Sequence, residues 1–179
     1  MIAELLALDP ALAMTCNDDG MTAIMYAAGG GHLPCLQFLV KNGAVVCALS
    51  KSGKTAIVAA ARGGHLPCLQ FLADNGADID AANKHGITAV MLAAQYGYLP
   101  CLNLLVEKGA NVDAVTTKGG MTAIIEGGAT KAIKVEGGIT AVMLAAQYGH
   151  LPCLQFLVEK KANVNAANEN DWTAIMAAA

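Results

Sequence analysis

The sequence predicts an all-α fold, a solenoid of stacked helix-turn-helix repeats with short β-hairpin turns, in which an 18-residue insertion interrupts one repeat. The first observation is a period: 33, 33, 34, 18 and 33 residues separate the threonines of six Thr-Ala-apolar stretches, Thr22, Thr55, Thr88, Thr122, Thr140 and Thr173. The second is that Pro-Cys pairs recur every 33 residues from Pro34 to Pro100, and the next pair, at Pro152, follows after 52. A fixed period of this length is typical of stacked repeats.

Composition supports this class and excludes others. Apolar residues make up 55% of the 179 residues but aromatic residues only 4%, which favours thin layers of short, closely packed helices. The net charge is -3 and the 11 basic residues are scattered, which argues against nucleic-acid and anionic-membrane partners. No apolar run is long enough to span a membrane, and Glu4 stands where a secretory signal carries basic residues. We therefore expect a soluble, cytoplasmic protein.

The elements follow in a fixed order within each period. A first helix is expected over residues 22–29, because Thr22 can cap it and the glycines after residue 28 end it. A second helix is expected over residues 33–43, with proline in the first turn and Gly43 as the left-handed residue at its end. Polar residues and glycine over residues 77–86 predict the hairpin-like connection to the next repeat.

One domain over residues 1–179 accommodates all of these units. Residues 1–16 form a half repeat, in which Met1 to Leu8 aligns with a second helix, and residues 168–179 form a half repeat with only a first helix. The complete repeats cover approximately residues 17–49, 50–82, 83–115 and 116–167.

The fourth repeat contains the inserted segment. Removal of residues 121–138 restores the period with one residue to spare, so we expect the first helix to begin at Thr140 and not at Thr122. The β-prone runs at residues 122–125 and 132–135 flank Gly127-Gly128, which predicts a hairpin or ordered loop beside the concave face. Such a segment is either a tolerated duplication or an added recognition arm.

These residues resemble the ankyrin repeat family, whose unit of about 33 residues has two antiparallel helices and a T-P-L-H-x-A-A signature. The matching stretches are residues 88–94, 64–66 and 109–114, and the likeness covers essentially the whole chain. The chain has Ala in place of the signature proline and Met, Val or Ile in place of the histidine. Lys161 and Asp171 replace two glycines of the repeat, so we expect a less regular C-terminal end.

Residues 48–55 match a relaxed phosphate-loop pattern and follow a strand-like stretch, which makes nucleotide binding a less favoured alternative. The same register in other repeats, for example Lys84-His85-Gly86-Ile87-Thr88, indicates an ordinary turn.

The His-x-x-Cys pairs, such as His32 with Cys35, resemble half of a metal site, but zinc needs four converging ligands and these pairs lie one repeat apart. We therefore expect no metal and no cofactor, and interpret Cys35, Cys68, Cys101 and Cys153 as buried apolar residues. Six buried thiols suit a reducing compartment. No nucleophile and base lie together in the pattern, so the protein is not expected to be an enzyme.

The resemblance implies that another protein binds the concave face formed by turn tips and first helices. The candidate contact residues are Asp18, Asp19, Met21, Lys51, Ser52, Lys54, Arg62, Lys84, His85, Ile87, Gln95, Tyr96, Gln147, Tyr148, Asn170 and Trp172. Among them Tyr96, Tyr148 and Trp172 are the expected anchors, because aromatic residues dominate interface energetics.

Two further hypotheses remain open. Residues 86–102 recur at residues 138–154 with one change, Tyr98 to His150, which would also suit an engineered or recombinant scaffold that carries an inserted loop and has no natural partner. Ile175 and Met176 offer no polar outer face to the last helix, which predicts a frayed end or end-to-end self-association.

Overall fold

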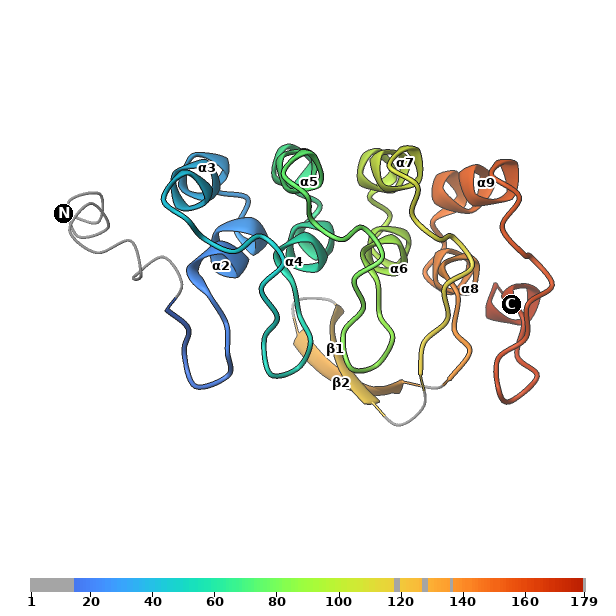
Figure 1. Ribbon diagram of the computed structural model, residues 1–179. Helices are drawn as coiled ribbons and strands as arrows, with labels where there is room; N and C mark the ends of the chain where they lie inside the picture. Colours follow the sequence, from blue (N-terminus) through green and yellow to red (C-terminus); the bar gives the residue numbers. More distant parts are fainter. Residues whose placement is uncertain (1–14, 118–119, 127–128, 136, 179) are drawn as a thin grey trace.

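The computed structural model describes residues 15–117, 120–126, 129–135 and 137–178, and these form a row of stacked helix pairs (Figure 1). The elements are α2 (Ala23–Gly29), α3 (Leu33–Lys41), α4 (Ala56–Gly63), α5 (Leu66–Asp74), α6 (Ala89–Gln95), α7 (Leu99–Glu107), β1 (Gly120–Glu126), β2 (Ala129–Val135), α8 (Ala141–Gln147), α9 (Leu151–Glu159) and α10 (Ala174–Ala177). The predicted all-α solenoid is confirmed. The expected helix at residues 1–8 lies outside the described residues.

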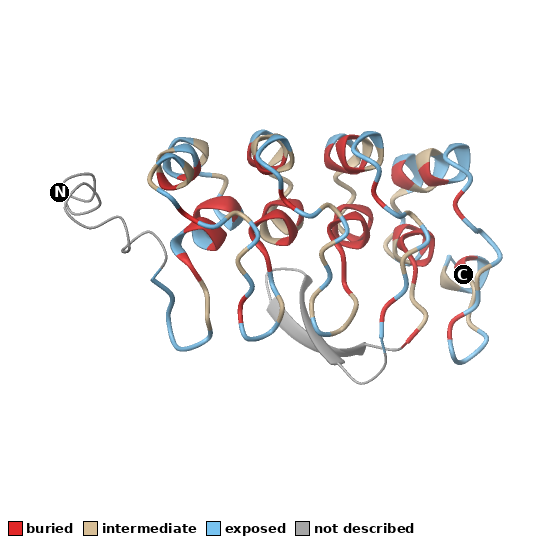
Figure 2. Cartoon of the chain, viewed as in Figure 1, coloured by how far each residue is buried: buried red, intermediate tan, exposed pale blue. Residues whose placement is uncertain are grey.

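The helices form two layers. The first helices α2, α4, α6 and α8 form one layer and continue into α10, whereas the second helices α3, α5, α7 and α9 form the other (Figure 1). Each first helix packs against the second helix of its own repeat and against the first helix of the next repeat. Buried side chains lie where these helices face one another, and the outer sides and turn tips are exposed (Figure 2). The stack is therefore held together by neighbouring repeats.

Threonine begins each first helix, as the sequence predicts. The hydroxyls of Thr55, Thr88 and Thr140 accept the backbone N–H of the residue three positions on, at 3.3–3.5 Å. Thr140, and not Thr122, begins α8, which confirms the predicted start of this helix. The buried Thr22 hydroxyl has no hydrogen-bond partner within the described part of the chain.

A left-handed residue ends each second helix. Gly43, Gly76 and Gly109 have φ values of 82–91°, and Lys161 takes the same role at φ 64°. The N–H of the residue after each of them returns to a carbonyl of the helix, for example Ala162 N–H to Leu157 O at 3.0 Å. The backbone of α9 thus ends as the other second helices do, although lysine lacks the conformational freedom of glycine.

Polar side chains at the start of each turn accept backbone N–H groups of the same turn. The Asn83 carboxamide oxygen accepts the N–H groups of His85 and Ile87, and Asn17 and Asn168 repeat this pattern. Neighbouring tips are joined by backbone hydrogen bonds, such as Lys84 N–H to Ser52 O at 3.1 Å. These bonds align the turn tips along one edge of the row.

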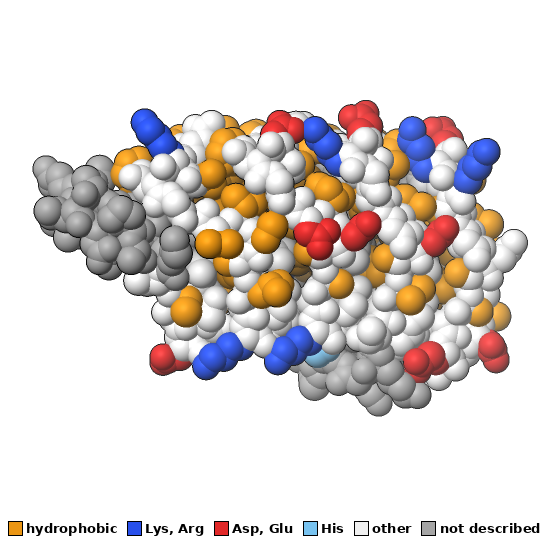
Figure 3. All heavy atoms as spheres, viewed as in Figure 1, with side chains coloured by type: hydrophobic (Ala, Val, Ile, Leu, Met, Phe, Trp, Pro, Cys, Tyr) orange, Lys and Arg blue, Asp and Glu red, His pale blue; other side chains and the backbone are white. Residues whose placement is uncertain are grey.

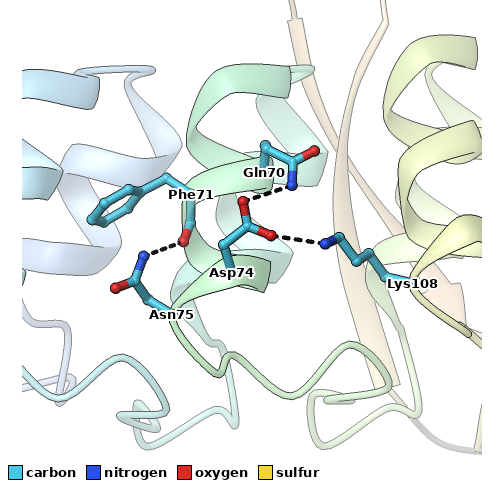
Figure 4. A network of polar contacts seen from close by, with 5 residues as sticks. All are labelled: Gln70, Phe71, Asp74, Asn75 and Lys108. Atoms are coloured by element: carbon cyan, nitrogen blue, oxygen red, sulfur yellow. Dashed lines mark hydrogen bonds and ion pairs between the residues drawn. The ribbon is translucent and has the colours of Figure 1, made fainter.

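An ion pair links the second helices α5 and α7 on the opposite edge. Lys108 Nζ lies 2.7 Å from Asp74 Oδ1, and the Gln70 amide donates to the other carboxylate oxygen (Figure 4). The hydrogen bonds from Lys108 and Gln70 lower the pKa of Asp74. Because both charged side chains are exposed to solvent, this bridge contributes little to stability.

The inserted segment is an antiparallel hairpin of β1 and β2, in which Gly120 pairs with Val135 and Glu126 with Ala129. It leaves the row at the edge of the turn tips (Figure 1). The predicted strands around residues 127–128 are confirmed.

The predicted bounds of the insertion, 121–138, and its length of 18 residues are not confirmed. Gly138 N–H donates to Thr116 O, and Thr117 N–H donates to His85 O, as the corresponding residues do in the other turns. The turn therefore comprises Thr116, Thr117, Gly137 and Gly138, and residues 118–136 are the added segment. The hydrogen bonds across the turn decide this, because glycine pairs on both sides make the sequence ambiguous.

Burial of the cysteines differs from the prediction. Cys68, Cys101 and Cys153 are buried, but Cys16, Cys35 and Cys47 are exposed. The second helices α5, α7 and α9, which carry the buried cysteines, each pack against a preceding second helix. In the described part of the chain no second helix precedes α3, which carries the exposed Cys35.

Candidate functional site

A hollow of about 550 Å³ spans the first three described repeats. Its lining residues come from the turns, the first helices and the residues that end those helices: Met21, Met25, Tyr26, Gly29, Gly30, Lys54, Val58, Ala59, Arg62, Gly63, Asn83, Ile87, Leu92 and Tyr96. The volume lies within the range of about 300–1,000 Å³ that is usual for ligand sites. The hollow is the candidate functional site.

Small residues create the hollow. Ala59 of α4 occupies the position that Tyr26 has in α2 and Leu92 has in α6, counted from the capping threonine. Four positions later, Gly63 stands where the third repeat has Tyr96. The small residues of the middle repeat therefore leave a space. Large side chains of the repeats on either side line this space.

Basic residues border the hollow. Lys54 and Arg62 are among its lining residues, and none of the lining residues that the structure describes is acidic. Lys51 and Lys84 are exposed on the adjoining turn tips. Basic side chains occupy this stretch of the tip edge, and acidic ones lie towards both ends of the row (Figure 3). Exposed lysines thus lie on the second and third tips, although the net charge of the chain is -3.

The structure brings five of the predicted contact residues together in this hollow. These are Met21, Lys54, Arg62, Ile87 and Tyr96. Seven others are exposed on the turn tips or on α8: Asp18, Asp19, Lys51, Ser52, Lys84, Gln147 and Asn170. The half-buried His85, Tyr148 and Trp172 also lie outside the hollow, so Tyr96 is the expected anchor that lies in it.

Two predicted contact residues are buried. Ile87 is 6% exposed and forms part of the wall of the hollow. Gln95 is also 6% exposed, and its side-chain nitrogen has no hydrogen-bond partner within the described residues. Gln147, at the equivalent position of α8, is exposed. We therefore leave Gln95 out of the candidate site.

Tyr26, which lines the hollow and is 58% exposed, is absent from the predicted contact residues. A signal was present, because Tyr26 is aromatic where the other complete repeats have alanine or leucine, at Ala59, Leu92 and Leu144. Tyr96, on the other side, packs against Tyr98 with ring centroids 6.1 Å apart, which limits the motion of its side chain.

The phosphate-loop pattern at residues 48–55 forms a turn whose N–H groups are already engaged. Lys51 N–H donates to Asp19 O, Gly53 N–H to Ser50 O, and Lys54 N–H to the Ser50 hydroxyl. A phosphate loop needs such N–H groups to point at the anion. This geometry weighs against the nucleotide-binding alternative.

Two histidines of the His-x-x-Cys pairs, His65 and His150, contact the preceding repeat. His65 Nε2 lies 3.0 Å from Gly29 O, and His150 Nε2 lies 2.9 Å from Gln95 O. The described residues contain no group of three or more His, Cys, Asp or Glu side chains suited to a metal ion. Burial raises the pKa of the Cys68 and Cys153 thiols and raises that of Cys101 to about 11.

Among the described helices, none combines the length and the apolar character required to cross a membrane.

Comparison with known proteins assigns the repeats. A family model described as "Ankyrin repeats (3 copies)" matches residues 1–83 and 121–179, and one described as "Ankyrin repeat" matches residues 85–117. No curated protein matches the chain.

Proposed function

Because this chain belongs to the ankyrin repeat family, whose members generally mediate protein–protein interactions and are typically non-catalytic, we propose that it is a non-catalytic module that binds another protein on its concave face. The concave face is the surface of turn tips and first helices that contains the hollow. Six free cysteines suit a reducing compartment such as the cytoplasm.

The observation that supports this proposal best is the hollow itself. It unites side chains from three repeats, and its walls combine apolar groups with Tyr26 and Tyr96. Concave, largely apolar surfaces with a few polar groups are where proteins bind ligands, and aromatic residues provide much of the binding energy at interfaces.

Affinity capture followed by alanine variants tests the proposal. Once a captured protein has been identified and purified, Tyr26→Ala and Tyr96→Ala should each weaken its binding about tenfold, since buried interface aromatics typically contribute more than about 1 kcal/mol. Gln37→Ala, at an exposed position of α3, is the matched control and should leave affinity unchanged. Unchanged binding by both tyrosine variants would place the interface elsewhere.

The scaffold alternative rests on the near-identity of residues 86–102 and 138–154. An engineered or recombinant stack without a natural partner would share the hollow, since packing alone creates it. Saturable binding of one purified protein, weakened by the tyrosine variants, excludes this alternative. Capture that yields no such protein favours it.

Self-association is a second proposed interaction. Ile175 and Met176 on α10 are 78% and 58% exposed, and a first helix of another copy could cover them as the first helices cover one another within the row. Light scattering should then show a mass that grows with concentration, and Ile175→Lys with Met176→Lys should restore the monomer. A monomeric parent chain at every concentration would exclude this interaction.

A further inference from the structure

We infer that the hollow accepts an acidic peptide segment, with a large apolar side chain in the hollow and neighbouring carboxylates beside Lys54 and the exposed Lys51 and Lys84 of the turn tips. This inference rests on the proposed function and names the chemistry of the partner.

The apolar part of the inference follows from the shape and lining. Val58 and Ala59 of α4 contribute to the lining together with Met25, Tyr26 and Leu92 from the neighbouring helices. Burial of an apolar side chain against this lining is favourable, because it removes apolar surface from water. An aliphatic or aromatic residue of the partner fits this chemistry.

The acidic part follows from the distribution of charge. Lys54 lines the hollow, and the exposed Lys51 and Lys84 extend the basic surface along the second and third tips. Asp18 and Asp19 are exposed on the first tip, and the lining residues that the structure describes include no carboxylate. A partner with Asp or Glu beside its apolar anchor is attracted here, whereas a basic partner is repelled.

A peptide is favoured over a small organic acid because the basic surface extends beyond the hollow. Lys51 and Lys84 lie on two successive tips that a backbone hydrogen bond from Lys84 N–H to Ser52 O holds side by side. A small carboxylate within the hollow would leave these tips unused. An extended segment can contact both the hollow and the tips.

Selection from a displayed library of random peptides, with the full chain as bait, tests the inference. The enriched peptides should carry Asp or Glu within a few positions of Leu, Ile, Met, Phe or Trp. A fluorescent synthetic copy of the most enriched peptide then gives affinities by fluorescence anisotropy. Benzoate, a small aromatic carboxylate, is titrated separately as the small-molecule probe.

Two variants of the hollow have defined expectations. Ala59→Leu introduces the residue that Leu92 and Leu144 provide in other repeats, so the stack should fold while the hollow is filled and peptide affinity falls about tenfold. Lys54→Glu should weaken peptide binding about tenfold and reduce the dependence of affinity on salt.

Matched controls lie on the second helices. Ala73→Val introduces the residue found at Val40, Val106 and Val158, and Lys41→Glu makes the same charge change on the other layer. Both should leave affinity within about twofold, since long-range effects of a single screened surface charge are small. Circular dichroism confirms that every variant retains the helicity of the parent chain.

The outcomes separate the inference from the proposed function. Enrichment of neutral or basic peptides, no enrichment, benzoate binding alone, or unchanged affinity in Lys54→Glu would overturn the inference. If a neutral peptide is enriched and Ala59→Leu weakens its binding, that result would still support binding at the concave face. If a purified partner protein binds Ala59→Leu, Tyr26→Ala and Tyr96→Ala as tightly as the parent, the proposed function itself fails.

Discussion

Lys161 and Asp171 have left-handed backbones, at φ 64° and 58°, in positions that other repeats give to glycine. This conformation costs a residue with a Cβ atom about 1–2 kcal/mol, although asparagine and aspartate tolerate it better than most. Both residues follow the backbone path of their repeat instead of disrupting it. The stack therefore imposes the local conformation on them.

Lys161→Gly should consequently raise the free energy of unfolding by about 1 kcal/mol, because it relieves this strain. The neighbouring Lys160 has φ -82°, so Lys160→Gly should lower the free energy of unfolding by about 0.5–1 kcal/mol through backbone entropy. Lys160→Gly also loses the contact of Nζ with the Phe156 ring, at 5.3 Å from the centroid. Urea denaturation measures both changes. Effects of the same sign would contradict the strain at Lys161.

The Cys101 thiol makes the stability of the fold depend on pH. Burial raises its pKa from 9.0 to about 11, so the unfolded chain ionises at lower pH than the folded chain. The stability that depends on the neutral thiol is complete below about pH 9 and is lost as the pH rises to about 11. Cys101→Val has no thiol at this position. The melting temperature of the parent should therefore fall relative to that of Cys101→Val as the pH rises across this range. Cys35→Ala, at an exposed thiol, should parallel the parent chain.

At the scale of elements, the hairpin of β1 and β2 is the feature that sets the fourth repeat apart. It begins and ends within a turn, at the exposed edge of the row, and the hydrogen bonds of Thr116, Thr117 and Gly138 continue across it. Lengthening a loop there costs about 0.6 kcal/mol per doubling of its length. The fold can therefore carry the insertion without a change in the helices.

Two deletions distinguish the bounds of this insertion. Removal of residues 118–136 joins Thr117 to Gly137 and leaves a turn of the same length as Asn83 to Ile87, so helicity and melting temperature should equal or exceed those of the parent. Removal of residues 121–138 eliminates Gly138, whose φ of 80° and N–H bond form the turn, so the melting temperature should fall. Circular dichroism during heating measures both.

Equal stability of the two deletions would mean that the turn tolerates either register. Loss of partner binding in the folded 118–136 deletion would identify the hairpin as a recognition arm, and retained binding would identify it as a tolerated duplication.

At the scale of the whole molecule, we expect cooperative unfolding to depend on contacts between neighbouring repeats. In these contacts an aromatic or imidazole ring of one repeat lies on the backbone of the previous repeat. A Cβ added to Gly97 would lie 2.6 Å from the His150 ring, and one added to Gly64 would lie 2.8 Å from the Tyr98 ring. The His150 ring also hydrogen-bonds to Gln95 O. Close contacts of this kind transmit stability along a stack of repeats.

Gly97→Ala should therefore uncouple the fourth repeat from the third. Gly149 has nearly the same φ, 71° against 73°, but no residue that the structure describes lies within 4 Å of an added Cβ. Gly149→Ala should cost about 1 kcal/mol for the backbone alone, and Gly97→Ala a further 1–3 kcal/mol or so from overpacking. In urea, the unfolding transition should broaden or split into two for Gly97→Ala, and it should remain a single transition for Gly149→Ala. Identical midpoints would show that the His150 ring moves aside freely.

The sequence by itself determined the repeat, the order of helices and the hairpin strands, because these depend on local signals. Thr55, Thr88 and Thr140 cap helices through their own next turn, and Gly43 ends a helix through its own φ. The residues that make such interactions lie close together in the sequence, so the sequence alone predicts them. The strands flanking residues 127–128 belong to the same class.

Only the tertiary structure decided what the stacked repeats create together. The hollow arises because Ala59 lies between the larger side chains of Tyr26 and Leu92, which are far apart in sequence. Cys35 is exposed and Gln95 buried for the same reason, since the exposure of a repeated position depends on whether a neighbouring helix covers it. A side chain is buried when helices of neighbouring repeats pack over it, and the sequence of a single repeat does not contain those helices.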